Sequence, residues 1–423
     1  MLLRFGVSNH LSIRDEQELL FTVSSLHDRK DGLIDCAGAP RGSIVPAVVT
    51  YGANASGKSN LIHAMGTMQR LVLTSQTQGA PGGGVPHFAF KLDDASIEKP
   101  SQYDIDFILD GVRYHYGFES TDTQFEAEWL YAFPKSHRRV LFERQRDNYR
   151  FGRELRGRNS VIAELTRPNT LFVSAAAQHN HEQLSGVFSY FRSLQSFMSI
   201  SVPSEQAATV FAQDGLDPRV LSFLERIGTG VYDYRLKETA LPEEMANLQQ
   251  EVLDLIKRRT TTPIEFETTN MLYTIELAHR SRSGKPVYLE LGMESAGTLR
   301  LLMVLSLVYH ALDHGVPVVI DELDASLHTL ASEAILQLFC SRETNPKGAQ
   351  LIATTHDTNL LASPALRRDQ VWFTEKDPNG ATVIFPLTEI RTRSGDNFQR
   401  GYLQGRYGAI PFSGPVPTLG TQH

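Results

Sequence analysis

Apolar and polar residues alternate in the first part of the chain, which is the period of a β-strand. Residues 3–7 and 18–23 are expected to form an antiparallel strand pair. Asp110-Gly111, a dipeptide typical of tight hairpin turns, separates the strand-like segments 103–109 and 112–118. Further short strands are expected at residues 126–133, 139–144 and 149–151. The N-terminal part is therefore predicted to contain an antiparallel sheet.

Helical spacing of apolar residues replaces this alternation from about Leu184. Asp217-Pro218 and Gly228 bracket a helix that has an N-cap, an early proline and a glycine stop. The segment 243–258 carries apolar residues three and four positions apart, at Met245, Leu248, Val252 and Leu255. This repeat is too short for a long coiled-coil arm. We expect a short helical hairpin or lid whose apolar stripe packs against a neighbouring helix.

The rest of the chain alternates strands and helices. Strand character returns at residues 264–267, 272–277 and 287–291, helices are expected at 296–314 and 327–339, and strands follow at 316–320, 350–355, 371–374 and 381–385. The later alternation is typical of a mostly parallel sheet with covering helices. The predicted fold is α/β, with an antiparallel subdomain, a mostly parallel sheet and a helical insertion. The predicted parts are an N-terminal lobe (1–178), the helical insertion (179–262), a C-terminal lobe (263–411) and a loose tail (412–423).

The stretch Gly-Ala-Asn-Ala-Ser-Gly-Lys-Ser, residues 52–59, has the spacing of a phosphate loop. An apolar strand is expected before it, at residues 44–51, and helical spacing follows it. In such a loop backbone N–H groups wrap a polyphosphate, the lysine reaches its outer phosphates, and the serine hydroxyl holds Mg²⁺. An ordinary turn between a strand and a helix is the alternative, which the position of Lys58 and Ser59 disfavours. The residues assigned to nucleotide binding are Gly52, Asn54, Ser56, Gly57, Lys58, Ser59 and Asn60.

Two carboxylates follow the apolar strand near residue 320. Asp321 could hold the water shell of Mg²⁺, and Glu322 could polarise the attacking water as a general base. A buried strand that ends in an acidic turn is common by itself, but beside a phosphate loop it points to nucleotide hydrolysis. His356 ends the next strand; such a histidine is usually structural, yet here it could contact the γ-phosphate. Residues 294–298, Glu-Ser-Ala-Gly-Thr, begin a helix and form a second candidate anion site.

The composition narrows the possible functions. The 41 Lys and Arg residues are outnumbered by 48 Asp and Glu, so the formal net charge of −7 argues against wholesale coating of nucleic acid. Cys36 and Cys340 have no metal-ligand spacing, which fits a reducing compartment. The apolar run 301–309 is too short to span a bilayer, and no secretory signal is evident. We expect a cytoplasmic protein without a membrane segment.

Basic residues gather in one segment, 135–158. Such a stripe could contact a phosphate backbone, with an affinity that falls steeply as salt rises. A solvated strand face, or a docking surface for an acidic partner, would explain it equally well. The basic residues are Lys135, Arg138, Arg139, Arg144, Arg146, Arg150, Arg153, Arg156 and Arg158, against Glu143, Asp147 and Glu154.

The order and spacing of these stretches resemble the ATP-binding cassette ATPases of the SMC, repair-exonuclease and OLD-like kind. Residues 52–59 resemble Walker A, 294–298 the signature, 318–322 Walker B, 323–328 the D-loop, and His356 the switch histidine. The resemblance implies two heads that sandwich two ATP molecules. In such a dimer Ser295 and Gly297 would contact the γ-phosphate held by the other head, and Asp324 would link the two sites.

A narrower resemblance covers most of the chain. Residues 5–14, 51–61, 90–92 and 405–412 are similar to the bacterial abortive-infection ATPases of the AbiL or RloA type. This implies a part in anti-phage defence beside a separate effector, often a nuclease of the RloB or Toprim-like type. Because few residues follow His356, we expect the nuclease on another chain.

The leading hypothesis is an ATPase that binds ATP and Mg²⁺, forms a homodimer or a higher oligomer of dimers, and regulates a separate effector. Glu322, His356 and Lys58 are the expected catalytic residues, and Ser59 and Asp321 the expected metal ligands. One alternative is a DNA-maintenance or repair ATPase whose clamp binds DNA ends through the basic stripe. Another is a scaffold that binds ATP without hydrolysing it.

Overall fold

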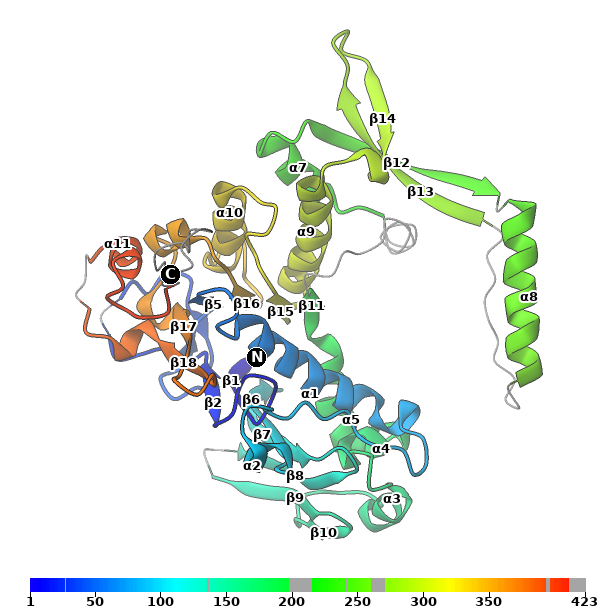
Figure 1. Ribbon diagram of the computed structural model, residues 1–423, viewed down its shortest axis with the longest axis vertical. Helices are drawn as coiled ribbons and strands as arrows, with labels where there is room; N and C mark the ends of the chain where they lie inside the picture. Colours follow the sequence, from blue (N-terminus) through cyan, green and yellow to red (C-terminus); the bar gives the residue numbers. More distant parts are fainter. Residues whose placement is uncertain are drawn as a thin grey trace, which may run out of the picture. The chain divides into compact units, whose positions relative to one another are not determined.

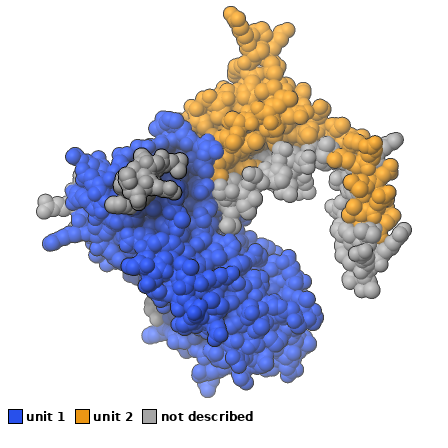
Figure 2. Space-filling model, viewed as in Figure 1, with its two compact units in different colours: residues 1–199, 310–423 blue, residues 200–309 orange. Residues whose placement is uncertain are grey.

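The computed structural model describes residues 1–26, 28–134, 137–197, 215–240, 242–259, 271–392 and 396–410. The chain divides into two compact units, one of residues 1–199 with 310–423 and one of residues 200–309 (Figure 2). Both predicted ATPase lobes contribute to the first unit. The second unit combines part of the predicted insertion with the start of the predicted C-terminal lobe. The strand predicted at 264–267 and the predicted tail lie outside the described residues.

The antiparallel part of the first unit is a seven-stranded sheet in the order β10-β9-β8-β7-β6-β1-β2 (Figure 1). Its predicted strands and hairpin are confirmed. Asp110 and Gly111 adopt φ values of 50° and 76°, which match the twist of the flanking strands. The strands are β1 (Leu2–Ser8), β2 (Gln17–Leu20), β6 (Ser101–Leu109), β7 (Val112–Ser120), β8 (Phe125–Phe133), β9 (Arg139–Gln145) and β10 (Asn148–Phe151).

The second sheet of this unit has six strands in the order β11-β15-β16-β5-β17-β18. Neighbouring strands run parallel except β17 and β18, which confirms the predicted mostly parallel sheet. Every residue of β5, β15 and β16 is buried, as expected for strands covered on both faces. The strands are β11 (Gln195–Phe197), β15 (Pro317–Ile320), β16 (Gln350–Thr354), β5 (Ala47–Gly52), β17 (Val371–Lys376) and β18 (Thr382–Pro386).

Helix α1 (Lys58–Gln78) lies between the two sheets (Figure 1). Its apolar side belongs to one core with the inner faces of both sheets, which fixes the start of the helix in place. Helices α4 (Phe172–Gln178) and α5 (Glu182–Ser193) pack on α1, and α10 (Thr329–Phe339) packs on β16. The unit also contains β3 (Ile34–Asp35), β4 (Ser43–Ile44), α2 (Asp94–Ile97), α3 (Asn159–Leu165) and α11 (Phe398–Leu403).

The strand predicted at 44–51 and the start of the helical section need correction. Pro46, which cannot donate a ladder hydrogen bond, interrupts that strand and leaves β4 and β5. The helices α3 and α4 precede the predicted helical section, and each has only seven residues, too few for a clear period.

A buried carboxylate explains where α4 begins. Glu128 is fully buried and accepts hydrogen bonds from the backbone N–H groups of Phe172 at 2.6 Å and Val173 at 3.1 Å. Arg144 lies 3.6 Å from the same carboxylate and donates to the carbonyl oxygen of Thr170 at 2.5 Å. Arg144 is therefore a core residue, and its place in the predicted basic stripe is wrong.

The second unit contains a three-stranded antiparallel sheet in the order β12-β13-β14. The predicted helical insertion is wrong over β12 (Val231–Ala240), which pairs with β13 (Met271–Arg280); β14 is Pro286–Glu290. The predicted helices are confirmed as α7 (Pro218–Arg226), α8 (Glu243–Arg259) and α9 (Ala296–His314), of which the last continues into the first unit. The Asp217 side chain caps α7 by accepting from the N–H of Arg219 at 2.8 Å.

The apolar stripe of α8 differs from its expected packing. Met245, Leu248 and Val252 have exposed fractions of 55%, 60% and 47%, while Leu253 is buried. Because these three side chains are largely exposed, the expected packing of the stripe against a neighbouring helix is wrong for the described residues.

Helix α9 is long and apolar enough, by length and composition alone, to cross a membrane. Half of its apolar window is buried inside the protein, and core helices pass the same test. The run 301–309 that suggested a shorter segment is the middle of this helix.

Candidate nucleotide-binding site

The phosphate loop connects β5 to α1, as the sequence predicts. Gly57 precedes the helix with a φ of 112°, a conformation that side chains rarely allow. A Cβ atom at Gly52 would lie 2.6 Å from the hydroxyl of Ser56, so the backbone passes where a side chain cannot. The curved backbone and the positive end of the α1 dipole suit a polyphosphate.

Lys58 is buried inside the curve of this loop. Its ammonium donates to the carbonyl oxygens of Gly52 at 2.8 Å and Ala53 at 3.0 Å. Burial lowers the pKa of this ammonium to about 8, although Asp321, Asp324 and Glu322 all raise it. When a phosphate binds in the loop, its charged oxygens would replace the neutral carbonyl oxygens as acceptors of the Lys58 hydrogen bonds.

Ser59 and Asp321 meet at the carboxyl end of the parallel sheet. The Ser59 hydroxyl lies 3.3 Å from the Asp321 carboxylate, which also accepts from the Thr354 hydroxyl at 2.5 Å. Two ligands of an octahedral Mg²⁺, each about 2.1 Å from the ion, lie about 3.0 Å apart. The hydroxyl and the carboxylate therefore fit Mg²⁺, and Thr354 orients the carboxylate from the next strand.

Glu322 follows Asp321 in a strained backbone conformation. Its φ is 52°, which is uncommon for a residue with a side chain. The Glu322 N–H donates to the Thr354 hydroxyl at 2.7 Å, so one threonine fixes both acidic residues. Strain of this kind is typical of functional sites.

Asp324 joins the segment after β15 to the end of β16. It accepts from the Thr355 hydroxyl at 2.7 Å and from the backbone N–H of His356 at 3.1 Å. The His356 side chain is exposed. The structure thus brings together Lys58, Ser59, Asp321, Glu322, Asp324 and His356, all of which the sequence predicts. Gly52, Ser56, Gly57 and Asn60 lie in or beside the same loop, and Asn54 is exposed at its turn.

The sequence alone did not reveal a brace formed by the β17–β18 hairpin and the N-terminal loop. The Thr382 hydroxyl donates to the Ser56 carbonyl at 2.8 Å, and Thr374 and Ser56 hydroxyls lie 2.6 Å apart. Ser12 binds the Thr382 hydroxyl at 2.7 Å and accepts from the Asn60 amide at 2.6 Å. No motif marks these residues, since hydroxyl groups are common and only the fold brings them together.

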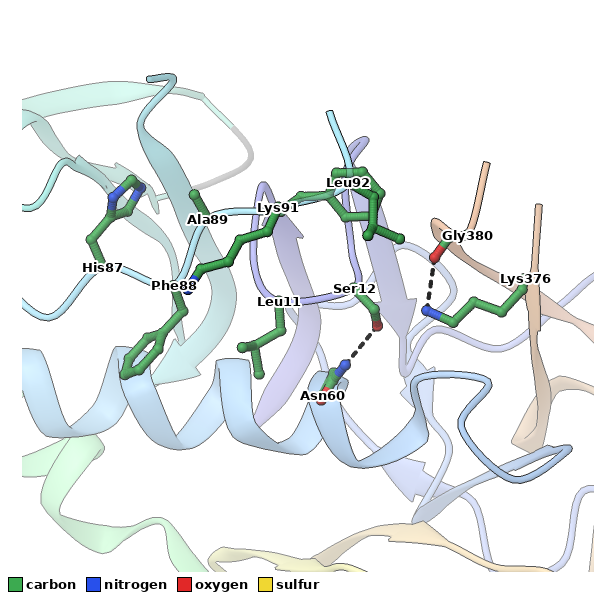
Figure 3. Close-up of a pocket in the computed structure, with 11 residues that line it drawn as sticks. Leu11, Ser12, Asn60, His87, Phe88, Ala89, Lys91, Leu92, Lys376 and Gly380 are labelled. Atoms are coloured by element: carbon green, nitrogen blue, oxygen red, sulfur yellow. Dashed lines mark hydrogen bonds between the residues drawn. The ribbon is translucent and has the colours of Figure 1, made fainter. Parts of the chain in front are cut away.

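A pocket of about 380 Å³ lies beside the first turn of α1 (Figure 3). Asn60 and Ser12, which belong to the brace, line it. Its other lining residues include the apolar Leu11, Phe88 and Leu92 and the cations Lys91 and Lys376. The volume is within the range of small-molecule sites, and apolar walls with few polar groups suit a base and its sugar.

The residues of the predicted signature lie in the second unit. The Ser295 hydroxyl accepts from the N–H of Thr298 at 3.1 Å, so Ser295 caps α9. The preceding Glu294 carboxylate pairs with His279 of β13 at 2.6 Å. The part of Ser295 and Gly297 in nucleotide binding stays a prediction.

A further group of possible metal ligands, Asp104, Asp106 and His115, lies on the antiparallel sheet of the described chain. Arg4 bonds directly to Asp104 and lies 3.6 Å from Asp106, and Arg113 pairs with Asp106 at 2.8 Å. Guanidinium groups thus compensate these carboxylates, and the cluster is an ion-pair network.

Comparison with known families agrees with this geometry. The family model described as "AAA domain, putative AbiEii toxin, Type IV TA system" matches residues 48–362, which is well over half of the chain. The matched range begins in β5 and includes the phosphate loop, Asp321, Glu322 and His356. No curated protein matches the chain.

Proposed function

We propose that this chain, which belongs to the AbiEii-toxin-like AAA-domain family of P-loop ATPases, binds Mg-ATP and hydrolyses it to ADP and phosphate. The observation that carries the proposal is the 3.3 Å approach of Ser59 to Asp321, with Glu322 next in the chain. Ser59 and Asp321 lie 262 positions apart in the sequence, and they meet there with the residue types that phosphoryl transfer requires.

Each residue has a separate task in this proposal. Lys58 stabilises negative charge on the transferring phosphate, and Glu322 accepts a proton from the attacking water. Ser59 and Asp321 would hold Mg²⁺, which neutralises phosphate charge when it is bound. His356 would orient the γ-phosphate and water from the end of β16.

The pocket beside α1 supports adenine as the base. Guanine presents two adjacent N–H donor groups, for which a carboxylate is the natural acceptor. The described residues that line this pocket include no carboxylate. ATP is therefore the nucleotide to test first, with GTP as the comparison.

The test is steady-state phosphate release by the wild type, Lys58→Ala and Glu322→Gln. Lys58→Ala should lose nucleotide binding, because the cation inside the loop is gone. Glu322→Gln should bind ATP but lose turnover by a factor of roughly 100 or more, the usual contribution of a general base. Glu343→Gln, an exposed residue outside the site, is the matched control. Normal turnover in Glu322→Gln would exclude it as the base.

We also propose a narrower class of ATPase for this chain and an oligomeric state. We place the chain with the SMC- and OLD-like ATP-binding cassette ATPases, near the AbiL and RloA type, as a cytoplasmic homodimer or oligomer of dimers. Support comes from the order of the phosphate loop, the signature-like segment and the acidic pair along the chain, and from Ser295 at the start of α9. Glu322→Gln with ATP should elute as a dimer, and Ser295→Arg should prevent that shift while leaving nucleotide binding intact.

The proposed biological role is regulation of a separate effector, such as a RloB- or Toprim-like nuclease, in bacterial anti-phage defence. The family description, which names a toxin of a toxin–antitoxin system, supports this setting. Co-purification with the product of the neighbouring gene, followed by nuclease assays with and without ATP, tests it. A neighbour that neither binds nor changes activity would count against an effector.

A DNA-maintenance clamp is the second candidate, and exposed arginines in β10 and just before β9 favour it. Arg138 stacks 3.8 Å from the ring of Tyr131, and 78% of the Arg150 side chain is exposed. Glu143 lies 3.4 Å from both guanidinium groups, which reduces their net charge. DNA binding that weakens steeply with salt and with Arg138→Gln/Arg150→Gln would favour this candidate.

A further inference from the structure

Lys376 lies outside every motif recognised in the sequence and outside the residues matched by the family model. It is exposed, at the end of β17, and its ammonium donates to the Gly380 carbonyl at 2.9 Å and to the Thr382 hydroxyl at 3.1 Å (Figure 3). An ammonium has three N–H donors. These two hydrogen bonds therefore leave one donor for a ligand in the pocket that Lys376 lines.

The register of the sheet places Lys376 beside the phosphate loop. β17 pairs with β5 in parallel, and Thr374 lies opposite Gly52, where the loop begins. Lys376 is two residues further along, which is about 6.6 Å beyond the end of β5. Alternate residues of a strand share a face. Because Thr374 contacts Ser56 of the loop, Lys376 projects on that same face.

The two lysines flank different parts of a bound nucleotide. Lys58 lies inside the loop, where the outer phosphates bind. The nucleoside must leave the loop near the first turn of α1, where Asn60 lines the pocket. We propose that Lys376 binds the α-phosphate and ribose end of the nucleotide, as a second cation of the site.

This inference rests on the proposed function, because it requires ATP in the phosphate loop. The test compares binding of ATP, ADP and inorganic pyrophosphate to the wild type and to Lys376→Met by calorimetry. Loss of a charge-assisted hydrogen bond should weaken ATP and ADP binding by roughly 10-fold or more. Pyrophosphate binding should be unchanged, since it has neither the α-phosphate nor the ribose and fills the two outer-phosphate positions.

Two further variants separate direct contact from support of the loop. Thr374→Val removes the hydroxyl that contacts the Ser56 hydroxyl and leaves both partners of Lys376 in place, so it should weaken pyrophosphate and ATP binding alike. Lys347→Met is the matched control, because Lys347 also donates to a backbone carbonyl, that of Asp313, near the opposite end of β16. It should bind all three ligands as the wild type does, and Lys376→Arg should retain most of the ATP affinity.

The outcomes are distinguishable. Equal weakening of ATP and pyrophosphate in Lys376→Met would overturn the proposed contact and leave a structural role. Unchanged ATP binding in Lys376→Met would overturn it as well. If the wild type binds neither ATP nor pyrophosphate, the proposed ATPase function fails, and the inference fails with it.

Discussion

The pKa of Lys58 predicts how nucleotide affinity depends on pH. In the free protein burial lowers this pKa to about 8, from the usual value of 10.5. Phosphate oxygens in the loop would favour the charged ammonium and raise its pKa again. Binding above pH 8 must therefore include uptake of a proton by Lys58. The affinity should be highest near pH 7 and should fall as pH rises through 8.

The magnitude follows from the fraction of charged lysine. With a pKa of about 8, about nine-tenths of the free protein carries the ammonium at pH 7, and about one-tenth at pH 9. The ATP affinity should thus fall about tenfold between pH 7 and pH 9. The terminal phosphate of ATP, with a pKa of about 6, is already ionised across this range and adds little to the change.

Calorimetry at constant Mg²⁺ measures this effect directly. Titrations at pH 8.5 in two buffers with different ionisation enthalpies should report uptake of most of one proton. Lys58→Arg is the matched control, because a guanidinium stays charged throughout and should remove the pH dependence. Equal wild-type affinity at pH 7 and pH 9, or the same slope in Lys58→Arg, would refute the reasoning.

Two other changes test the supporting structure. Arg144→Met leaves the buried Glu128 without its cation and should lower the free energy of unfolding in urea by about 3–5 kcal/mol; the exposed Arg150→Met should change it by less than about 0.5 kcal/mol. A smaller loss in the Arg144→Met/Glu128→Gln double variant would confirm that the unpaired charge is the cause. Asp324→Ala removes the acceptor of the Thr355 hydroxyl and of the His356 N–H. Because one hydrogen bond to a charged group contributes about 1.5 kcal/mol, kcat should fall by about tenfold while the ATP affinity stays unchanged. An equal loss of ATP affinity would contradict this prediction.

The sequence predicted those parts of the fold in which apolar residues repeat with a clear period or in which turn residues mark the ends of an element. The hairpin at Asp110-Gly111, the helix after Asp217 and α9 all form where they were expected. The phosphate loop and the acidic pair were predictable too, because their chemistry requires fixed residue types at fixed spacing. Their approach in space follows from strand order, since β5, β16 and β15 are parallel neighbours whose carboxyl ends share one edge.

Short and exposed elements were not predictable in the same way. β12 has mostly exposed residues after Val231, yet apolar and polar residues alternate from Tyr232 to Lys237, a strand signal that the predicted helical insertion overlooked. The start of α4 depends on Glu128, which accepts from the N–H group of Phe172, a residue 44 positions later in the sequence. Arg144 looked like a surface cation because its neighbours in sequence are basic. Only the tertiary structure shows its buried partner, since sequence neighbours on a strand point to opposite faces.

The brace at the phosphate loop has a direction that the sequence cannot show. The Thr382 hydroxyl donates its hydrogen to the Ser56 carbonyl, so Ser12 must donate to Thr382, and Ser12 in turn accepts from Asn60. The Ser12 hydroxyl thus accepts one hydrogen bond and donates the next, while the Thr382 hydroxyl accepts from both Ser12 and Lys376 and donates to Ser56. This series of hydrogen bonds begins on α1 and returns to the loop that precedes α1. Two of its members, Ser12 and Thr382, lie 370 residues apart in the sequence. The geometry of the phosphate loop therefore depends on the closure of the whole first unit, including a C-terminal hairpin that lies beyond the matched family range.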